Sequence, residues 1–232
     1  ATVFDPGFVT TTLGGPKVAS DLLALRWDYI FFTGGVNIGK IVAKAAAEHL
    51  TPTTLELGGK NPCIVDQTAH ISVSAKRIVW GKFFNCGQTC IAPDYVLVHK
   101  NVKAKLIDYL TKEIGRAYGD HIHQSEDYGR IINDAHFNRL VGLLENQHMI
   151  FGGESDAKTR FLSPTLVEVD QLDSDLMRYE IFGPILPIVT YSHWEEVHNI
   201  ITSYEKPLSF YIFSERKQEA KKLMETYSYG GG

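Results

Sequence analysis

Three short segments carry residue types that could perform covalent chemistry, and the first contains Cys90. This cysteine lies in the segment FNCGQTCIAP (84–93), where Gly87 interrupts a helical pattern shortly before a strand pattern. A thiol on such a turn is accessible, but it reacts as a thiolate and therefore needs electrostatic help from its surroundings. From its position alone, Cys90 could be either a nucleophile or a packed core residue.

The second segment places a carboxylate at the end of a strand pattern. Glu56 lies in TLELGGK (54–60), and ligands of open α/β sheets bind outside the carboxyl ends of parallel strands. A carboxylate there can act as a general base on a water molecule. The alternative, which the sequence supports equally, is that Glu56 is simply a polar side chain on a half-exposed strand.

The third segment, EIFGP (180–184), displays Glu180 and Phe182 just before a Gly-Pro turn. By itself it also fits a loop with one core phenylalanine. A separate glycine-rich turn separates a buried strand pattern from a helix pattern, and N–H groups at such a helix start favour phosphate. It matches neither G-x-G-x-x-G nor a P-loop, and a tight turn would need glycine in any case. Its residues are Gly34, Gly35, Val36, Asn37, Ile38 and Gly39.

The elements that must position these residues alternate along the chain. Periodicity predicts strands at 8–13, 28–33, 53–57, 63–65, 95–99, 166–169, 185–190 and 209–213. Helices are predicted at 16–25, after Gly35, and at 72–84, 101–116, 134–147, 194–203 and 216–227. This alternation predicts an α/β fold with a parallel sheet covered on both faces, and the Gly58-Gly59 pair is the expected boundary between two α/β units.

Composition excludes several other classes of protein. The 232 residues are 44% hydrophobic and 22% charged, with a net charge of −4, so we expect a globular core and no nucleic-acid partner. The chain has no secretory signal pattern, and no stretch reaches the ~18 apolar residues of a membrane span.

Three cysteines suit a reducing intracellular compartment. Cys86 and Cys90 are four residues apart, which is not the spacing of a zinc site, so we expect no metal.

Together and in this order, the segments resemble the aldehyde dehydrogenase superfamily, and in particular its class 3 and fatty aldehyde branch. The resemblance rests on HLTPTTLELGGKNPC (49–63), GQTCIAPDYVL (87–97) and EIFGPILPIV (180–189), and it runs from about residue 8 to the end. It implies that 1–58 are the C-terminal half of a Rossmann-like dinucleotide-binding domain. It also implies that 59–232 are most of an α/β catalytic domain of the aldehyde dehydrogenase type, without its C-terminal end.

The resemblance also implies a mechanism and a set of site residues. Cys90 matches the nucleophile that forms a thiohemiacetal and then a thioester, and Glu56 matches the base that activates water for hydrolysis. Glu180 and Phe182 match residues that hold the nicotinamide half of NAD or NADP, and 34–39 match the turn facing its pyrophosphate. The implied reaction oxidises a medium- or long-chain aliphatic or an aromatic aldehyde to the carboxylic acid.

Some features depart from the family pattern or leave alternatives open. Val36 stands where a hydroxyl or amide side chain is usual, and Tyr179 where an acidic residue is common. Because the family's chain is about twice as long, we expect 1–232 alone to turn over aldehydes poorly. A coenzyme A-acylating dehydrogenase, a non-catalytic relative serving as a structural or interaction protein, and a plain dinucleotide-binding module are the alternatives. The resemblance further implies a homodimer that is cytoplasmic, or membrane-associated through a C-terminal tail outside this sequence.

Overall fold

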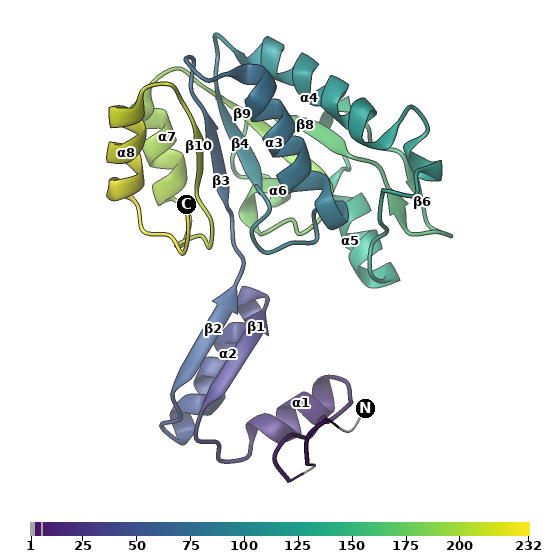
Figure 1. The fold of residues 1–232 in the computed structure, drawn as a ribbon, viewed down its shortest axis with the longest axis vertical. Coiled ribbons are helices and arrows are strands. Elements are labelled where there is room, and N and C mark those ends of the chain that lie inside the picture. Colours follow the sequence, from purple (N-terminus) through teal and green to yellow (C-terminus); the bar gives the residue numbers. More distant parts are fainter. Residues whose placement is uncertain (1–2, 6) are drawn as a thin grey trace. The chain divides into compact units, whose positions relative to one another are not determined.

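The chain divides into two compact units, Ala1–Leu57 and Gly58–Gly232 (Figure 1). A computed structural model describes residues 3–5 and 7–232. Among these residues, every helix is too short or too polar to cross a membrane.

The first unit is a small βαβ arrangement preceded by a helix. The strands β1 (Ile30–Gly34) and β2 (Thr53–Leu57) pair in parallel, with Ile30 opposite Thr53 and Gly34 opposite Leu57. The helix α2 (Val36–Glu48) makes the crossover that a parallel pair requires. The preceding helix α1 (Pro16–Leu23) begins at a proline, which is well suited to the first helical position because it lacks an N–H.

The second unit is built on a six-stranded sheet with the strand order β10-β3-β4-β9-β8-β5. Its neighbours pair in parallel except for the edge strand β5, which runs antiparallel to β8. The strands are β3 (Pro62–Val65), β4 (Tyr95–His99), β5 (His148–Phe151), β8 (Thr165–Val169), β9 (Ile185–Tyr191) and β10 (Tyr211–Phe213).

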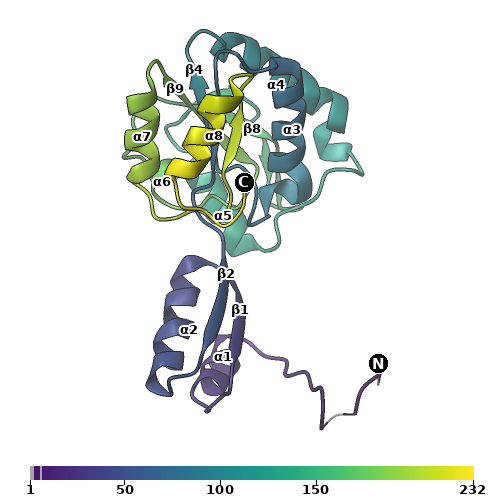
Figure 2. The same ribbon diagram turned by 60° about the vertical axis from the view of Figure 1, so that its left-hand side comes forward.

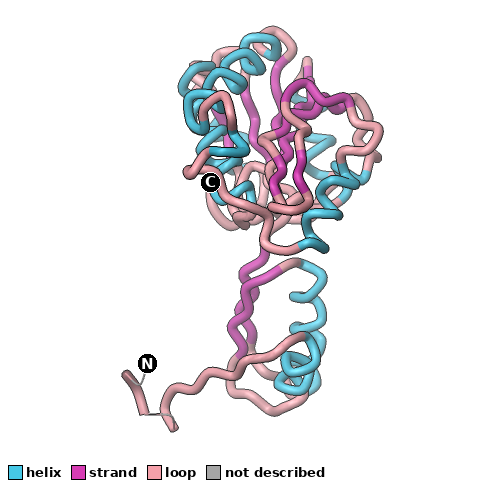
Figure 3. The backbone as a smooth tube through the Cα atoms, turned by 90° about the vertical axis from the view of Figure 1, so that its right-hand side faces the viewer, coloured by secondary structure: helices cyan, strands magenta, loops and turns pink. Residues whose placement is uncertain are grey.

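Helices cover both faces of this sheet, as Figures 2 and 3 show. One face packs against α3 (Ile71–Phe83) and α4 (Lys103–Tyr118), and the other against α5 (Asp134–Leu143), α6 (Asp175–Arg178) and α7 (Trp194–Thr202). The remaining elements are the helix α8 (Lys217–Thr226), the 3-10 turns η1 (Phe84–Gly87) and η2 (Ile122–Gln124), and a small hairpin of β6 (Ser155–Asp156) and β7 (Phe161–Leu162).

The pleat of the sheet explains why its central strands read as continuous apolar runs. In β4, Val96 and Val98 pack toward α3 and α4, whereas Tyr95 and Leu97 pack into the core on the other face. All five residues of β4 are buried. A parallel strand with helices on both sides has no solvent face, so alternation of apolar and polar residues disappears.

The sequence predicted most of this arrangement and missed its less regular parts. The α/β class and the parallel sheet covered on both faces are confirmed. The strand predicted at 8–13 is wrong: these residues pair with no strand among those described, and Phe8 and Leu13 are 79% and 87% exposed. The assignment of 1–58 and 59–232 to a cofactor domain and a catalytic domain stays a prediction.

The topology explains how segments far apart in the sequence come together. Residues 58–61, 90–94 and 180–184 directly precede β3, β4 and β9, which are neighbours in the sheet and run in the same direction. Starts of parallel strands lie along one edge, so these segments meet at the amino-terminal edge of the sheet. Ser209, shortly before the neighbouring strand β10, joins them there.

Replacement of Gly152 tests how closely the backbone after β5 packs against the backbone before β8. Gly152 has a φ of 78°, and a Cβ there would lie 2.0 Å from the carbonyl oxygen of Pro164. We expect Gly152→Ala to lower the free energy of unfolding by about 2 kcal/mol or more, because both the conformation and the contact oppose a side chain. Gly115→Ala is the matched control, since Gly115 lies within α4 and a Cβ there meets nothing within 4 Å. It should stabilise the protein by up to about 1 kcal/mol in urea unfolding. Equal effects of the two changes would contradict the argument.

Candidate active site

The turn that carries Cys90 is held by one buried amide side chain. Asn61 is 1% exposed, and its Nδ2 donates hydrogen bonds to the carbonyl oxygens of Cys90 (2.8 Å) and Ala92 (3.0 Å). Its Oδ1 accepts a hydrogen bond from the backbone N–H of Ser209 at 2.9 Å. Both amide hydrogens and the amide oxygen are thus used, which fixes the peptide of Cys90 relative to the segments before β3 and β10.

Cys90 itself is half-buried, unlike the other two cysteines. Cys63 and Cys86 are 0% and 1% exposed, as expected for packing residues. Burial raises the pKa of the Cys86 thiol to about 11 and raises that of Cys63 further still. Of the three thiols, only that of Cys90 is therefore accessible to a reactant.

The other end of the cysteine turn approaches the loop 180–184 backbone to backbone. Gly87 has a φ of 70°, and a Cβ there would lie 2.3 Å from the carbonyl oxygen of Gly183. The two preceding residues, Asn85 and Cys86, also have positive φ values, of 50° and 54°. The Gln88 side chain ties the turn to the segment 130–132. It donates a hydrogen bond to the carbonyl of Arg130 and accepts one from the N–H of Ile132.

A buried carboxylate connects the three segments. Asp94 is 3% exposed; its Oδ2 lies 2.5 Å from Lys60 Nζ, and its Oδ1 accepts the N–H of Ile181 at 2.9 Å. Lys60 Nζ also donates to the carbonyl of Leu176 at 3.0 Å. The ion pair is buried away from water, so removal of either residue would leave the charge of the other uncompensated.

Glu180 lies half-buried beside the same cluster. A Cβ on Gly58 would fall 2.0 Å from Glu180 Oε1, so only glycine leaves room for the carboxylate, which also accepts a hydrogen bond from the backbone of Gly59. Burial raises the pKa of Glu180, and Asp94 raises it further, whereas Gly59, Lys82 and Lys60 lower it.

A second buried lysine stands close to these charges. Lys82, in the last turn of α3, is 1% exposed. Burial lowers its pKa to about 8; the charge of Lys60 lowers it too, while the carboxylates of Asp94 and Glu180 raise it. The cluster therefore balances two carboxylates with two buried lysines.

The remaining predicted residues belong to the first unit. Glu56 is exposed on β2, where its backbone pairs with Thr33 of β1. Gly34 ends β1, Gly35 precedes α2 in an extended conformation, and a Cβ on Gly35 would meet nothing within 4 Å. Of the helix residues, Ile38 is 52% exposed, while Gly39 is buried and a Cβ there would lie 2.7 Å from Leu57 Cδ2.

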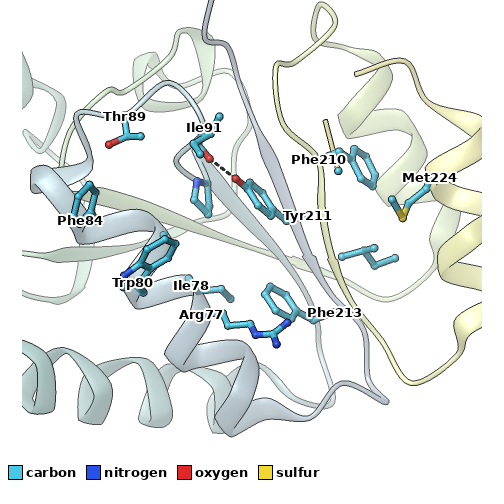
Figure 4. A pocket seen from close by; sticks show the side chains of 14 residues that line it. Arg77, Ile78, Trp80, Phe84, Thr89, Ile91, Phe210, Tyr211, Phe213 and Met224 are labelled. Atoms are coloured by element: carbon cyan, nitrogen blue, oxygen red, sulfur yellow. Dashed lines mark hydrogen bonds between the residues drawn. The ribbon is translucent and has the colours of Figure 1, made fainter. Parts of the chain in front are cut away.

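An apolar pocket of about 690 Å³ adjoins the cysteine turn. Thr89 and Ile91, on either side of Cys90, line it together with aromatic side chains (Figure 4). Trp80 and Phe84 stack with ring centroids 6.0 Å apart, and across the pocket the Tyr211 hydroxyl donates to the Ile91 carbonyl at 2.5 Å.

The structure thus brings Cys90, Glu180 and Phe182 to one edge of the second unit. Sequence reasoning assigned no role to the residues that hold them there. The motifs quoted above contain three of these residues, Lys60, Asn61 and Asp94. Their position directly before buried strands was the sequence feature that could have indicated a supporting role. Lys82 carried the opposite signal, a lysine on a helix, which is usually solvated.

Replacement of Asn61 tests whether its amide fixes the cysteine turn. We expect Asn61→Asp to remove both donated hydrogen bonds and to set a carboxylate oxygen against two carbonyls. Amide hydrogen exchange of peptides covering 84–94 should accelerate about 10- to 100-fold, as ~1–3 kcal/mol of local stability is lost. Asn101→Asp is the control, because the Asn101 amide donates to Gln67 at the exposed surface. Exchange unchanged within twofold would show that the turn is held in another way.

Replacement of Lys82 tests the cost of its burial. Because its folded pKa lies below the unfolded value, the full penalty is present below about pH 8 and disappears as the pH rises toward 10.5. The stability of Lys82→Met relative to the natural protein should therefore fall between pH 7 and 10, by on the order of 2 kcal/mol in urea unfolding. Lys100→Met, at an exposed position, should show no such trend. A flat difference for Lys82→Met would mean that the ammonium is not penalised by burial.

The chain matches the aldehyde dehydrogenase family over residues 2–231. It is 49% identical over 231 residues to 4,4'-diaponeurosporen-aldehyde dehydrogenase of Staphylococcus aureus, covering 99% of this chain and 50% of the relative. It is 46% identical to two rat proteins: aldehyde dehydrogenase family 3 member A2, covering 94% of this chain and 45% of the relative, and dimeric NADP-preferring aldehyde dehydrogenase, covering 98% and 50%. The chain spans about half the length of these curated relatives.

Solved structures agree with the sequence comparison. The substrate-bound state of Staphylococcus aureus AldH superposes with a TM-score of 0.96 at 48% identity, covering 99% of this chain and 50% of that one. Within the described residues, no three histidine, cysteine or acidic side chains gather where they could hold a metal ion. The predicted membership and fold type are confirmed: this chain belongs to the aldehyde dehydrogenase family, and its relatives include members of family 3.

Proposed function

We propose that the protein containing this chain oxidises an aldehyde to the carboxylic acid, with NAD or NADP as hydride acceptor and Cys90 as nucleophile. The observation that carries this proposal is the half-buried Cys90 thiol on a turn pinned by Asn61 and packed against the loop of Glu180. A nucleophile needs both access and a fixed geometry relative to its reaction partner, and this turn offers both.

Cys90 performs the first half-reaction. Its thiolate Sγ bonds to the carbonyl carbon, and the carbonyl electron pair moves to oxygen, giving a thiohemiacetal oxyanion. Backbone donors including the N–H of Cys90 stabilise that oxyanion. Re-formation of the carbonyl would release the aldehyde hydrogen as a hydride to the nicotinamide that a bound cofactor would supply, and the acyl group would remain on Cys90 as a thioester.

Glu56 performs the second half-reaction in this proposal. Its carboxylate takes a proton from a water molecule whose oxygen bonds to the thioester carbon, and the Cys90 thiolate leaves as the acid forms. Exposure of Glu56 at the carboxyl end of β2 supports the role, since a base for hydrolysis must reach solvent water. A hydrolytic base also argues against a coenzyme A-acylating enzyme, which must spare its thioester.

The residues present fit a dinucleotide cofactor. The start of α2 offers backbone N–H groups and a positive dipole end, and the open space around Gly35 would let a phosphate approach the backbone closely. Glu180, kept next to Gly58, would accept hydrogen bonds from ribose hydroxyls, and Phe182 would pack beside the nicotinamide ring. Bound NAD(P)+ would supply the hydride acceptor. On this assignment 1–58 belong to the cofactor domain and 59–232 to the catalytic domain.

The substrate proposed is an aldehyde with a long apolar or aromatic body. The pocket beside Cys90 is lined mainly by apolar side chains, among them Trp80, Phe84, Ile91 and Phe210. Its volume of about 690 Å³ lies in the range typical of small-molecule sites. The name of the Staphylococcus aureus relative, 4,4'-diaponeurosporen-aldehyde dehydrogenase, supports an aldehyde as the substrate.

We further propose a homodimer in an intracellular compartment. The name of the dimeric NADP-preferring rat relative supports the assembly, and three free cysteines suit a reducing compartment.

Trapping the thioester tests the proposed function. In the full-length protein supplied with a long-chain aldehyde and NAD(P)+, Glu56→Gln should release about one equivalent of NAD(P)H per subunit and then stall. Intact-mass and peptide analysis should find the acyl group on Cys90. Cys90→Ser should give neither product, because a serine hydroxyl without its own base is a far weaker nucleophile.

Cys86→Ser is the matched control, since Cys86 is the buried cysteine one turn earlier. It should keep turnover within a few-fold of the natural protein. Steady turnover by Glu56→Gln would remove Glu56 from the mechanism. Turnover that depends on coenzyme A would favour the acylating alternative, and absence of NAD(P)H formation by the natural protein would favour a non-catalytic relative.

A further inference from the structure

The loop 180–184 contains a backbone conformation that needs external support. Phe182 has a φ of 49°, in the left-handed region that a bulky side chain disfavours. Such a residue is strained and persists where its surroundings hold it in place. Because Glu180 and Phe182 flank Ile181, the groups that hold this backbone also determine where both side chains point.

The peptide groups of the loop are held from two sides. On one side, the N–H of Ile181 donates to Asp94 Oδ1 at 2.9 Å. On the other side, the carbonyl of Ile181 accepts a hydrogen bond from Arg139, and the carbonyl of Phe182 lies 2.7 Å from His136 Nε2. The two carbonyls that flank the left-handed residue are thus both hydrogen-bonded to side chains of α5.

The geometry of α5 makes this pair act together. His136 and Arg139 are three residues apart and therefore lie on the same face of the helix. The side chain of Asn133 accepts the N–H of His136 at 2.8 Å, which fixes the first turn. The buried core residues of α5 are Phe137 and Leu140, so the pair projects from a different face than the one packed into the core.

The contact between the two side chains sets the proton position on the imidazole. Arg139 Nε and Nη2 lie 3.3 and 3.2 Å from His136 Nδ1, and a guanidinium can only donate. Nδ1 is therefore the acceptor, and Nε2 carries the hydrogen that is donated to the Phe182 carbonyl. Arg139 thus supports the loop directly through Ile181 and indirectly through the imidazole.

We propose that His136 and Arg139 are positioning residues that hold the backbone of 181–182 so that Glu180 and Phe182 face the dinucleotide cofactor. This inference rests on the proposed cofactor role of Glu180 and Phe182. The absence of a side chain at Gly58 leaves room for the Glu180 carboxylate. The hydrogen bonds from α5 to the loop backbone set the direction in which that carboxylate points. The pair acts through the loop and touches none of the reacting atoms.

The test separates cofactor binding from chemistry in the full-length protein. His136→Ala and Arg139→Met should each raise the KM and the Kd for NAD(P) about tenfold, the effect of one lost hydrogen bond to a strained loop. The KM for aldehyde should stay within twofold. His136→Gln should recover part of the cofactor affinity, because its side-chain amide can donate to the Phe182 carbonyl.

Matched controls are His121→Ala and Arg116→Met, which change exposed side chains outside α5. Thermal unfolding of every variant shows whether the fold is intact. A similar rise in the KM for NAD(P) and in the KM for aldehyde, together with a lower unfolding temperature, would indicate a purely structural role and would overturn the inference.

Glu180→Ala distinguishes this inference from the proposed function. If Glu180→Ala weakens NAD(P) binding while the α5 variants bind normally, the inference is wrong and the proposed function stands. If Glu180→Ala also binds NAD(P) normally, the cofactor role on which the inference rests has failed.

Discussion

The buried carboxylate of Asp94 is the constraint on which the second unit's candidate site depends. It pairs with Lys60 before β3, ends the segment of the nucleophile candidate, and accepts the N–H of Ile181 before β9. A charge so far from water is tolerated only with partners in good geometry, so the three segments must keep their relative positions for the fold to remain stable. The same condition keeps Cys90 next to the loop of Glu180.

Electrostatic balance around Asp94 also explains why the site needs buried lysines. Two carboxylates, Asp94 and Glu180, lie near one another, and the charge of Asp94 raises the pKa of Glu180. Lys60 and Lys82 offset this repulsion, and burial in turn lowers the pKa of Lys82. The cluster is stable as a set, and its members cannot be assigned independent energies.

The sequence predicted the elements well where periodicity was strong. The observed bounds of β2 and β4 match the predicted strands at 53–57 and 95–99. All of β4 is buried and reads as an apolar run, whereas β2 is only half-buried and was delimited by Pro52 before it and the Gly58-Gly59 pair after it. The small elements β5, β6, β7 and α6 were missed because segments of two to four residues carry no periodicity. The supporting contacts could not be predicted, since Asn61 reaches residues 29 and 148 positions away, and only the strand order brings them together.

The close approach of Gly87 and Gly183 has a consequence for how this enzyme family could diversify. The distance between the cysteine turn and the loop 180–184 is set by backbone atoms in contact, with no side chain between them. Changes in the pocket-lining side chains, such as Trp80 or Ile91, therefore leave that distance untouched. If this pocket binds the aldehyde, as proposed, new substrate preferences could arise by substitution in its wall, while the spacing of the two segments is inherited intact.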